Sequence, residues 1–289
     1  MQRKVLIIGE HSYIGNSFKQ YVTQNHSIDS EIQVETVGAK NGQWEKKDFS
    51  QYDVILHVAA IVHQKEKLDK KQLYIDVNTK LPILVAKKAK QAGVKQFIFL
   101  STMSVYGNVE GAITEKTPLK PVTMYGKSKL LAERKLQELS SEQFKVAIVR
   151  PPMVYGKGCP GNYARLERLA KYCPVFPDVD NKRSMIHIKN LCEYLYLIIG
   201  REEVGIGLPQ NLFLIKTTDL FCKIRTSLSK RTYRTSLFNA IIFLLIKKSG
   251  SFSKMFGSCY YQKNAYFENQ IKIGIKEYQV VTYEESIYK

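Results

Sequence analysis

Apolar residues in the first half of the chain gather in short runs separated by longer amphipathic stretches. The runs are KVLIIG at 4–9, IQVETVG at 32–38, DVILHVAA at 53–60, QFIFLST at 96–102 and KVAIVRP at 145–151. Between them, residues 13–24, 71–92 and 125–140 have the spacing of helices with one apolar face. Near-continuous apolar strands that alternate with such helices are typical of a parallel sheet covered on both faces. The pattern therefore predicts an α/β protein with a doubly wound parallel sheet.

After residue 151 the alternation becomes irregular, with Pro and Gly breaks and a helix expected at about 189–199. Irregular material of this kind beside a regular sheet favours a second, smaller unit. We expect a nucleotide-binding domain over 1–155 and a smaller mixed α/β substrate lobe over 156–289. Residues 180–200 are expected to return to the first domain, so the boundary is interleaved.

Composition and charge narrow the class of protein. The 289 residues are 44% hydrophobic with a net charge of +18, and the five cysteines are widely spaced without a C-x-x-C pair. We therefore expect free thiols, no metal site and a cytoplasmic location. The longest apolar run, 237–246, is about half of what a membrane span requires.

The excess charge is concentrated in 204–267, which holds ten Lys or Arg residues and one acid, Asp219. A solvated lysine-rich face and attraction of phosphate-bearing molecules both explain it. No nucleic-acid-binding module accompanies the charge, so a nucleic-acid partner is not expected. Any membrane contact would be peripheral.

A glycine loop, GEHSYIG at 9–15, follows the first strand and opens the first helix. Gly9, Ser12 and Gly15 are candidates to let backbone N–H groups approach a pyrophosphate at the helix N-terminus. The second strand ends VGAKN, with Lys40 but without the carboxylate that hydrogen-bonds the ribose 2′-hydroxyl of NAD. This favours NADP(H) and leaves NAD(H) open. Asp48 is a candidate to hold the adenine amino group, or a plain surface acid.

A hydroxyl, a phenol and an amine follow the fourth strand. Thr102 ends FLST, and Tyr125 and Lys129 lie four residues apart in MYGKSK, one helical turn from each other on the same face. Hydride transfer at an oxygen-bearing carbon needs such a set: the phenol exchanges a proton with the oxygen, and the ammonium lowers the phenol pKa and holds the nicotinamide ribose. Thr102 would fix the substrate oxygen.

With GEHSYIG, DVILHVAA, VNTKLP, STMSVYG, YGKSK, RPPMVYGKG and RSMIHIKNL in this order, the chain resembles the extended short-chain dehydrogenase/reductases that act on nucleotide sugars, the epimerase/dehydratase family. The resemblance implies a Rossmann domain, a C-terminal lobe that binds a UDP-sugar, and often a homodimer. It places the catalytic set on Thr102, Tyr125 and Lys129. It makes Tyr125 and Lys129 cofactor contacts as well, and adds cofactor contacts at Tyr13, Ile14, Ala59, Ala60 and Asn78, the last of these more architectural than chemical. It places substrate contacts at Met103, Met153, Asn162 and Arg183.

The resemblance covers several reactions. Sugar 4,6-dehydratases resemble one another in an Asp-Glu pair after the catalytic threonine, where this chain has Met103 and Ser104. Epimerases tend to carry an asparagine at the position of Met153. The pattern is most similar to bacterial enzymes that reduce UDP-linked 2-acetamido-4-keto-6-deoxyhexoses for surface polysaccharides. The alternatives are a UDP-hexose or UDP-N-acetylhexosamine 4-epimerase with tightly bound NAD, and a non-catalytic nucleotide-binding scaffold.

Overall fold

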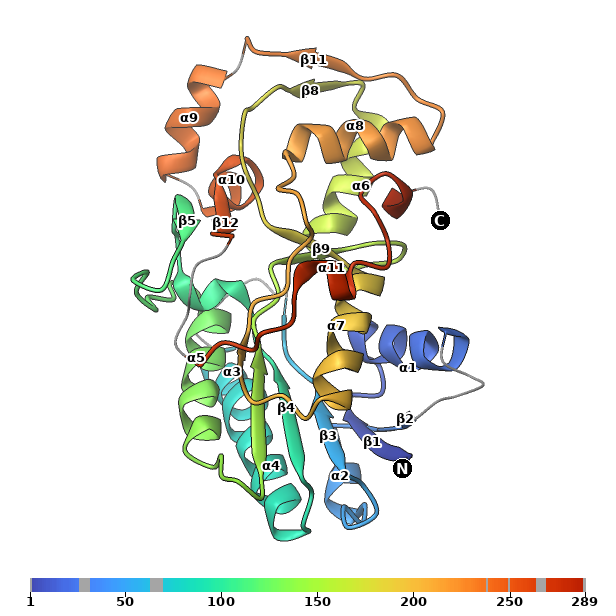
Figure 1. The fold of residues 1–289 in the computed structure, drawn as a ribbon. Helices are drawn as coiled ribbons and strands as arrows, with labels where there is room; N and C mark the ends of the chain where they lie inside the picture. The colour runs from blue at the N-terminus through green and yellow to red at the C-terminus, as the bar shows by residue number, and fades with distance from the viewer. Residues whose placement is uncertain are drawn as a thin grey trace.

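The computed structural model describes residues 2–25, 32–62, 70–237, 239–248, 250–263 and 269–287. Its centre is a six-stranded sheet in the order β10-β6-β4-β3-β1-β2, with every neighbouring pair parallel (Figure 1). The strands are, in the same order, Gly205–Gly207, Lys145–Val149, Gln96–Leu100, Val54–His57, Arg3–Ile8 and Ile32–Val37. The predicted doubly wound sheet is confirmed. The sixth strand, β10, was not predicted because Gly-Ile-Gly carries almost no apolar signal.

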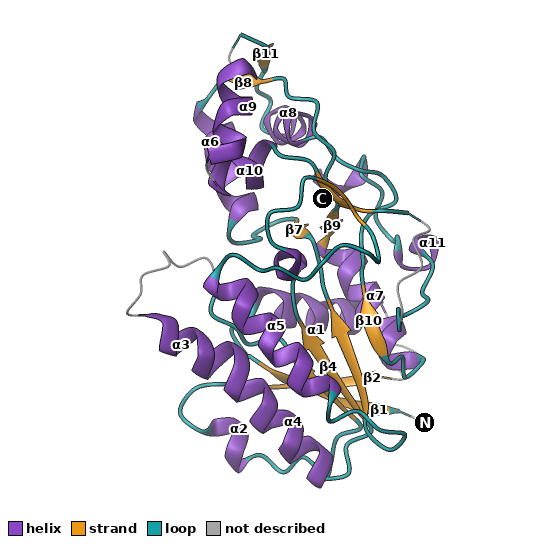
Figure 2. Ribbon diagram, turned by 90° about the vertical axis from the view of Figure 1, so that its left-hand side faces the viewer, coloured by secondary structure: helices purple, strands orange, loops and turns teal. Residues whose placement is uncertain are grey.

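Alternate residues of the strands point to opposite faces of the sheet and pack in two separate hydrophobic cores. Val5 and Ile7 of β1 pack in a cluster with helices α1 (Tyr13–Asn25) and α7 (Ile188–Gly200). Leu6 and Ile8 pack on the other side with α4 (Leu81–Gln91) and α5 (Met124–Gln137). Figure 2 shows α4 and α5 together on one face of the sheet. Burial on both faces explains why the inner strands β1, β3, β4 and β6 have near-continuous apolar runs, whereas the edge strand β2 is partly exposed and carries polar residues.

The expected helix at 71–92 is interrupted. It consists of α3 (Lys71–Ile75), a π-helical turn over Asp76–Lys80, and α4. Pro82, at the start of α4, lacks the N–H that would bond to the carbonyl of Asn78, so the regular ladder cannot pass this point. The side chain of Asn78, in this turn, is buried and bonds to the backbone of Ile61 and to the Ser128 hydroxyl.

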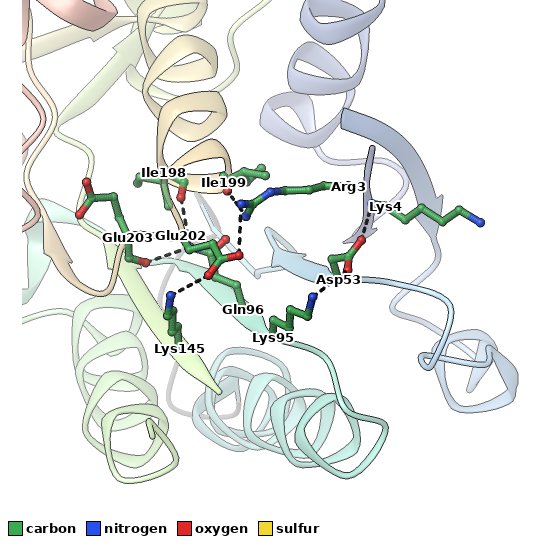
Figure 3. A network of polar contacts seen from close by, with 10 residues as sticks. All are labelled: Arg3, Lys4, Asp53, Lys95, Gln96, Lys145, Ile198, Ile199, Glu202 and Glu203. Carbon is green, nitrogen blue, oxygen red and sulfur yellow. Dashed lines mark hydrogen bonds and ion pairs between the residues drawn. The ribbon is translucent and has the colours of Figure 1, made fainter. Parts of the chain in front are cut away.

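A network of polar contacts closes the amino-terminal edge of the sheet (Figure 3). Glu202, just after α7, pairs with Arg3 at 3.1 Å and with Lys145 at 2.6 Å. Gln96 donates to the carbonyls of Ile198 and Glu203 at 3.1 and 2.9 Å. These contacts tie the end of α7 to β1, β4 and β6. A hollow lies here, but parallel sheets bind ligands at the opposite, carboxyl edge.

The second part of the molecule lies above that carboxyl edge and is mostly helical (Figures 1 and 2). Its cluster of buried residues unites α6 (Asn162–Tyr172), α8 (Thr217–Ser227), α9 (Asn239–Lys248) and α10 (Gly250–Phe256). Three parallel two-stranded pairs accompany the helices: β7–β9 (Met153–Tyr155, Met185–His187), β8–β11 (Val175–Pro177, Tyr233–Thr235) and β5–β12 (Gly111–Ile113, Cys259–Tyr261). Short helical segments complete the fold at α2 (Gln43–Lys46), η3 (Met103–Tyr106), α11 (Ile275–Tyr278) and η4 (Glu285–Ile287).

Helix α9 is apolar on both sides but buried on only one. Ile242 and Ile246 pack into the cluster, whereas Ile241, Phe243 and Leu244 are 57%, 52% and 63% exposed. No described helix has both the length and the apolar character needed to cross a membrane. A peripheral membrane contact through this helix stays a prediction.

Candidate active site

The glycine loop leaves no room for side chains against the sheet. Gly9 has φ 125°, and a Cβ there would lie 3.0 Å from the backbone nitrogen of Ala59. A Cβ at Gly15 would contact Ile7 and Val58, each at 3.1 Å. Ser12 precedes α1, and its Oγ accepts from the backbone N–H of Gly15 at 3.3 Å. A turn held this tightly at the start of a helix is the arrangement that fits a dinucleotide pyrophosphate.

The hydroxyl, phenol and amine meet at the end of β4. Tyr125 and Lys129 lie in the first two turns of α5, which Thr123 caps by accepting from the Gly126 N–H at 3.0 Å. The side chains of Tyr125 and Thr102 are hydrogen-bonded to each other. Lys129 is 1% exposed and donates to the Leu100 carbonyl at 2.8 Å. The structure therefore brings Thr102, which follows β4, to the start of α5, where Tyr125 and Lys129 lie.

The charges of this set differ from the expectation. Burial raises the pKa of Tyr125 to about 12, and the bond with Thr102 opposes that rise. Burial lowers the pKa of Lys129 to about 7, although the Glu133 carboxylate raises it. We expected the lysine to lower the phenol pKa, but here its ammonium is directed to the Leu100 carbonyl and stands 4.3 Å from the centre of the Phe99 ring. The phenol is consequently protonated at neutral pH.

A buried ion pair supports the same strand end, and the sequence analysis missed it. Glu133, 1% exposed, lies 2.6 Å from Arg150, whose guanidinium also donates to the Tyr106 hydroxyl at 2.9 Å. Ser101, beside Thr102, donates to the Glu133 carboxylate. Glu133 follows Lys129 by four residues and Arg150 follows β6 directly. That helical spacing and the position at the carboxyl edge were signals that could have found them.

His57 lies below this edge, fully buried beside Phe97 and Phe99. Burial, followed by the charge of Lys129, lowers its pKa from 6.5 to about 3. Between these values the unfolded chain binds the proton and the folded chain does not, so stability is present above pH 6.5 and lost as the pH falls toward 3.

We expect His57→Phe to reduce this acid sensitivity. The free energy of unfolding in urea, measured for both proteins at about pH 5 and about pH 8, should favour the variant more at the lower pH. The lowered pKa of His187, about 4, is common to both proteins and cancels in the comparison. Parallel behaviour of the two proteins would contradict the assignment.

The remaining cofactor candidates have diverse surroundings. Asn78 accepts from the Ile61 N–H at 2.8 Å and donates to the Ile61 carbonyl at 3.1 Å, which suits an architectural role. Asp48 accepts from the backbone and hydroxyl of Ser50 in a local turn. Lys40 is exposed, the Tyr13 hydroxyl donates to the Lys157 carbonyl, and Ile14 is partly buried. Ala59 and Ala60 follow β3. Their roles stay predictions.

Two of the four substrate candidates, Met103 and Arg183, each contact Cys259 of β12. The sulfur atoms of Met103 and Cys259 are 3.8 Å apart, and Arg183 pairs with Cys259 through the backbone. The Arg183 guanidinium donates to the carbonyls of Gly257 and Ser253 at 2.6 and 3.3 Å, so a diphosphate would have to compete with these bonds. Met153, in β7, is half-buried, and Asn162 is exposed at the start of α6. Their contacts with substrate stay predictions.

Comparison with known proteins identifies the family of this chain. A model of the NAD dependent epimerase/dehydratase family matches residues 5–207. A UDP-glucose 4-epimerase of Vibrio cholerae is 32% identical over 195 residues, covering 63% of this chain and 58% of the relative. An N-acetyl-α-D-glucosaminyl-diphospho-ditrans,octacis-undecaprenol 4-epimerase of Escherichia coli O157:H7 is 27% identical over 212 residues, covering 68% and 62%. In both cases the match spans less than two thirds of the relative.

Solved structures share the fold. A dTDP-4-dehydrorhamnose reductase of Bacillus anthracis in complex with NADP has a TM-score of 0.67 at 20% identity, covering 83% of this chain and 86% of that one. A UDP-glucuronic acid 4-epimerase of Bacillus cereus in complex with NAD has a TM-score of 0.66 at 16% identity, covering 99% and 96%. At these identities the likeness concerns the fold alone.

Proposed function

The chain belongs to the NAD dependent epimerase/dehydratase family, and we propose that it is an enzyme that transfers a hydride between a nicotinamide cofactor and an oxygen-bearing carbon of a UDP-linked sugar. The observation that carries the proposal is the convergence at the end of β4, where Tyr125 bonds to Thr102 and Lys129 bonds to the Leu100 carbonyl. A proton donor at the carboxyl edge of a sheet that begins with a dinucleotide-type glycine loop suits this chemistry.

When bound, the nicotinamide supplies the hydride chemistry. Gly9, Ser12 and Gly15 would hold the pyrophosphate. Thr102 Oγ1 already accepts from the Ser104 N–H at 3.1 Å, so its own hydrogen is available to the Tyr125 oxygen. That bond stabilises the phenolate left when Tyr125 gives its proton to the sugar oxygen.

Within this class we favour reduction of the 4-keto group of a UDP-linked 2-acetamido-4-keto-6-deoxyhexose. A reductase begins its cycle with a protonated phenol, and burial keeps Tyr125 in that form by raising its pKa to about 12. Met103 offers no carboxyl for water elimination, and Met153 no amide. The identity of the sugar rests on the sequence resemblance.

A 4-epimerase is the second candidate, because the two curated relatives described above are named 4-epimerases. Such an enzyme would keep NAD bound and use Tyr125 as base and acid in turn. It would consume no cofactor.

Incubation with a UDP-4-keto-6-deoxy-N-acetylhexosamine separates the candidates. We expect stoichiometric oxidation of reduced dinucleotide, followed by its absorbance, and a 4-hydroxy product by NMR. Interconversion of UDP-N-acetylhexosamine epimers without dinucleotide oxidation would instead favour the epimerase. Dinucleotide binding without turnover of either sugar would indicate a non-catalytic scaffold.

A further inference from the structure

The end of β2 is occupied by side chains that come from elsewhere. Gly38, the residue after β2, is buried and has no side chain of its own. A Cβ built there would lie 2.7 Å from Oε1 of Glu10 and would overlap the side-chain amide of Gln43. The Gln43 amide and, next to it, the Glu10 carboxylate of the glycine loop therefore occupy the space that a side chain at the end of β2 would take.

Three other charged groups belong to this region, of which two are paired and one is exposed. Glu35, on β2 itself, accepts from the Tyr52 hydroxyl at 2.6 Å and from Lys47 at 2.9 Å. Glu35 and Lys47 are therefore paired with each other. Lys40 is an exposed side chain. The partner of Glu10 among the described residues is His11, at 3.3 Å, whose ring is 90% exposed.

We propose that Glu10 selects NAD(H) over NADP(H) in this protein, taking the place of the acid that is missing after β2. The proposal rests on the proposed function, because it assumes that the glycine loop binds a dinucleotide. In doubly wound dinucleotide-binding folds the adenosine ribose lies at the end of the second strand, and a carboxylate there accepts a hydrogen bond from the 2′-hydroxyl. Gln43, in contact with the same space, offers a further polar group.

The same carboxylate disfavours the phosphorylated cofactor. A 2′-phosphate carries close to two negative charges and would stand against Glu10 at the distance of a hydrogen bond. Lys40, on which the expectation of NADP(H) was based, is exposed to solvent, which screens its attraction. The Glu10 side chain is 38% exposed, but its carboxylate stands directly against Gly38 at the end of the strand, so its repulsion would act on a phosphate bound there.

The test is a pair of binding measurements on the full chain, with NADH and NADPH titrated separately by calorimetry. Wild type should bind NADH about tenfold or more tighter than NADPH. In Glu10→Gln, which removes the charge and keeps the shape, the preference should shrink by about tenfold, mainly through tighter NADPH binding. Glu45→Gln, which removes an exposed charge from neighbouring α2, is the matched control and should keep the wild-type ratio. Lys40→Ala should keep it as well.

The outcomes separate this inference from the proposed function. Equal or tighter binding of NADPH by wild type would overturn the role of Glu10 while leaving the dinucleotide site intact, and so would a Glu45→Gln variant that behaves as Glu10→Gln. If neither dinucleotide binds, the proposed function fails, and the inference fails with it. Wild type that prefers NADPH, together with a Lys40→Ala variant that prefers NADH, would assign the selection to Lys40.

Discussion

Tyr125→Phe is expected to lower turnover by about 10²- to 10⁴-fold, the usual contribution of a positioned general acid. The variant loses one oxygen. Its ring keeps the packing at the start of α5, and Thr102 loses only its partner. Because the main role of the hydroxyl is to deliver the proton and the dinucleotide has many other expected contacts, the affinity for reduced cofactor should change by less than about threefold.

Turnover and cofactor affinity must be measured on the same preparation. Tyr278→Phe is the matched control, because it removes another buried hydroxyl, bonded to the Gln210 carbonyl at 2.9 Å, in the cluster on the opposite face of the sheet. It should retain wild-type kcat. Full activity in Tyr125→Phe would refute the assignment of the acid. Equal losses in the two variants would show that the effect is structural.

Glu133→Gln is expected to destabilise the fold by about 3–5 kcal/mol, since it leaves the Arg150 guanidinium buried without its counter-charge. The side chains of Glu133 and Arg150 are 1% and 5% exposed, and water cannot replace the lost carboxylate. Proximity to Glu133 raises the pKa of Lys129, so the variant should also leave a larger share of Lys129 neutral at pH 7.

Urea unfolding at fixed pH measures the stability effect. Glu138→Gln, which breaks the exposed pair with Lys135 later on the same helix, is the matched control and should cost about 1 kcal/mol or less. The double variant Glu133→Leu, Arg150→Met should recover most of the loss, because it removes both buried charges together. If Glu133→Gln were no more costly than Glu138→Gln, the pair would not stabilise the strand end.

Much of the sheet could be predicted from the sequence because its inner strands are buried on both faces and are therefore mostly apolar. Five apolar runs became β1, β2, β3, β4 and β6 within a few residues of the predicted bounds. β10 escaped prediction because three residues with two glycines make no pattern, and only its pairing with β6 defines it as a strand. The π-helical turn likewise depends on Pro82 and on packing around Asn78, which the periodicity of 71–92 does not reveal.

The sequence was enough to predict which residues form the site, but not the pKa shifts that set their protonation states. Tyr125 and Lys129 had to share a face, since residues four apart on a helix always do. The direction of the Tyr125 pKa shift was not predictable, because burial and the position of the Lys129 ammonium depend on chain segments far away in the sequence. The contacts of Arg183 with α10 and the loop after it, 70 or more residues later, belong to the same category.

The amino-acid sequence by itself determined the parallel sheet, the glycine turn and the helical spacing of phenol and amine, because each follows from local periodicity or from backbone conformation. Only the tertiary structure decided which carboxylates stand beside these features. Glu133 reaches Arg150 across the sheet edge, and Glu10 lies beside Gln43 in the space over Gly38. The physical reason is that the energy of a charge depends on what surrounds it in three dimensions, and those surroundings are assembled from strands and helices far apart along the chain.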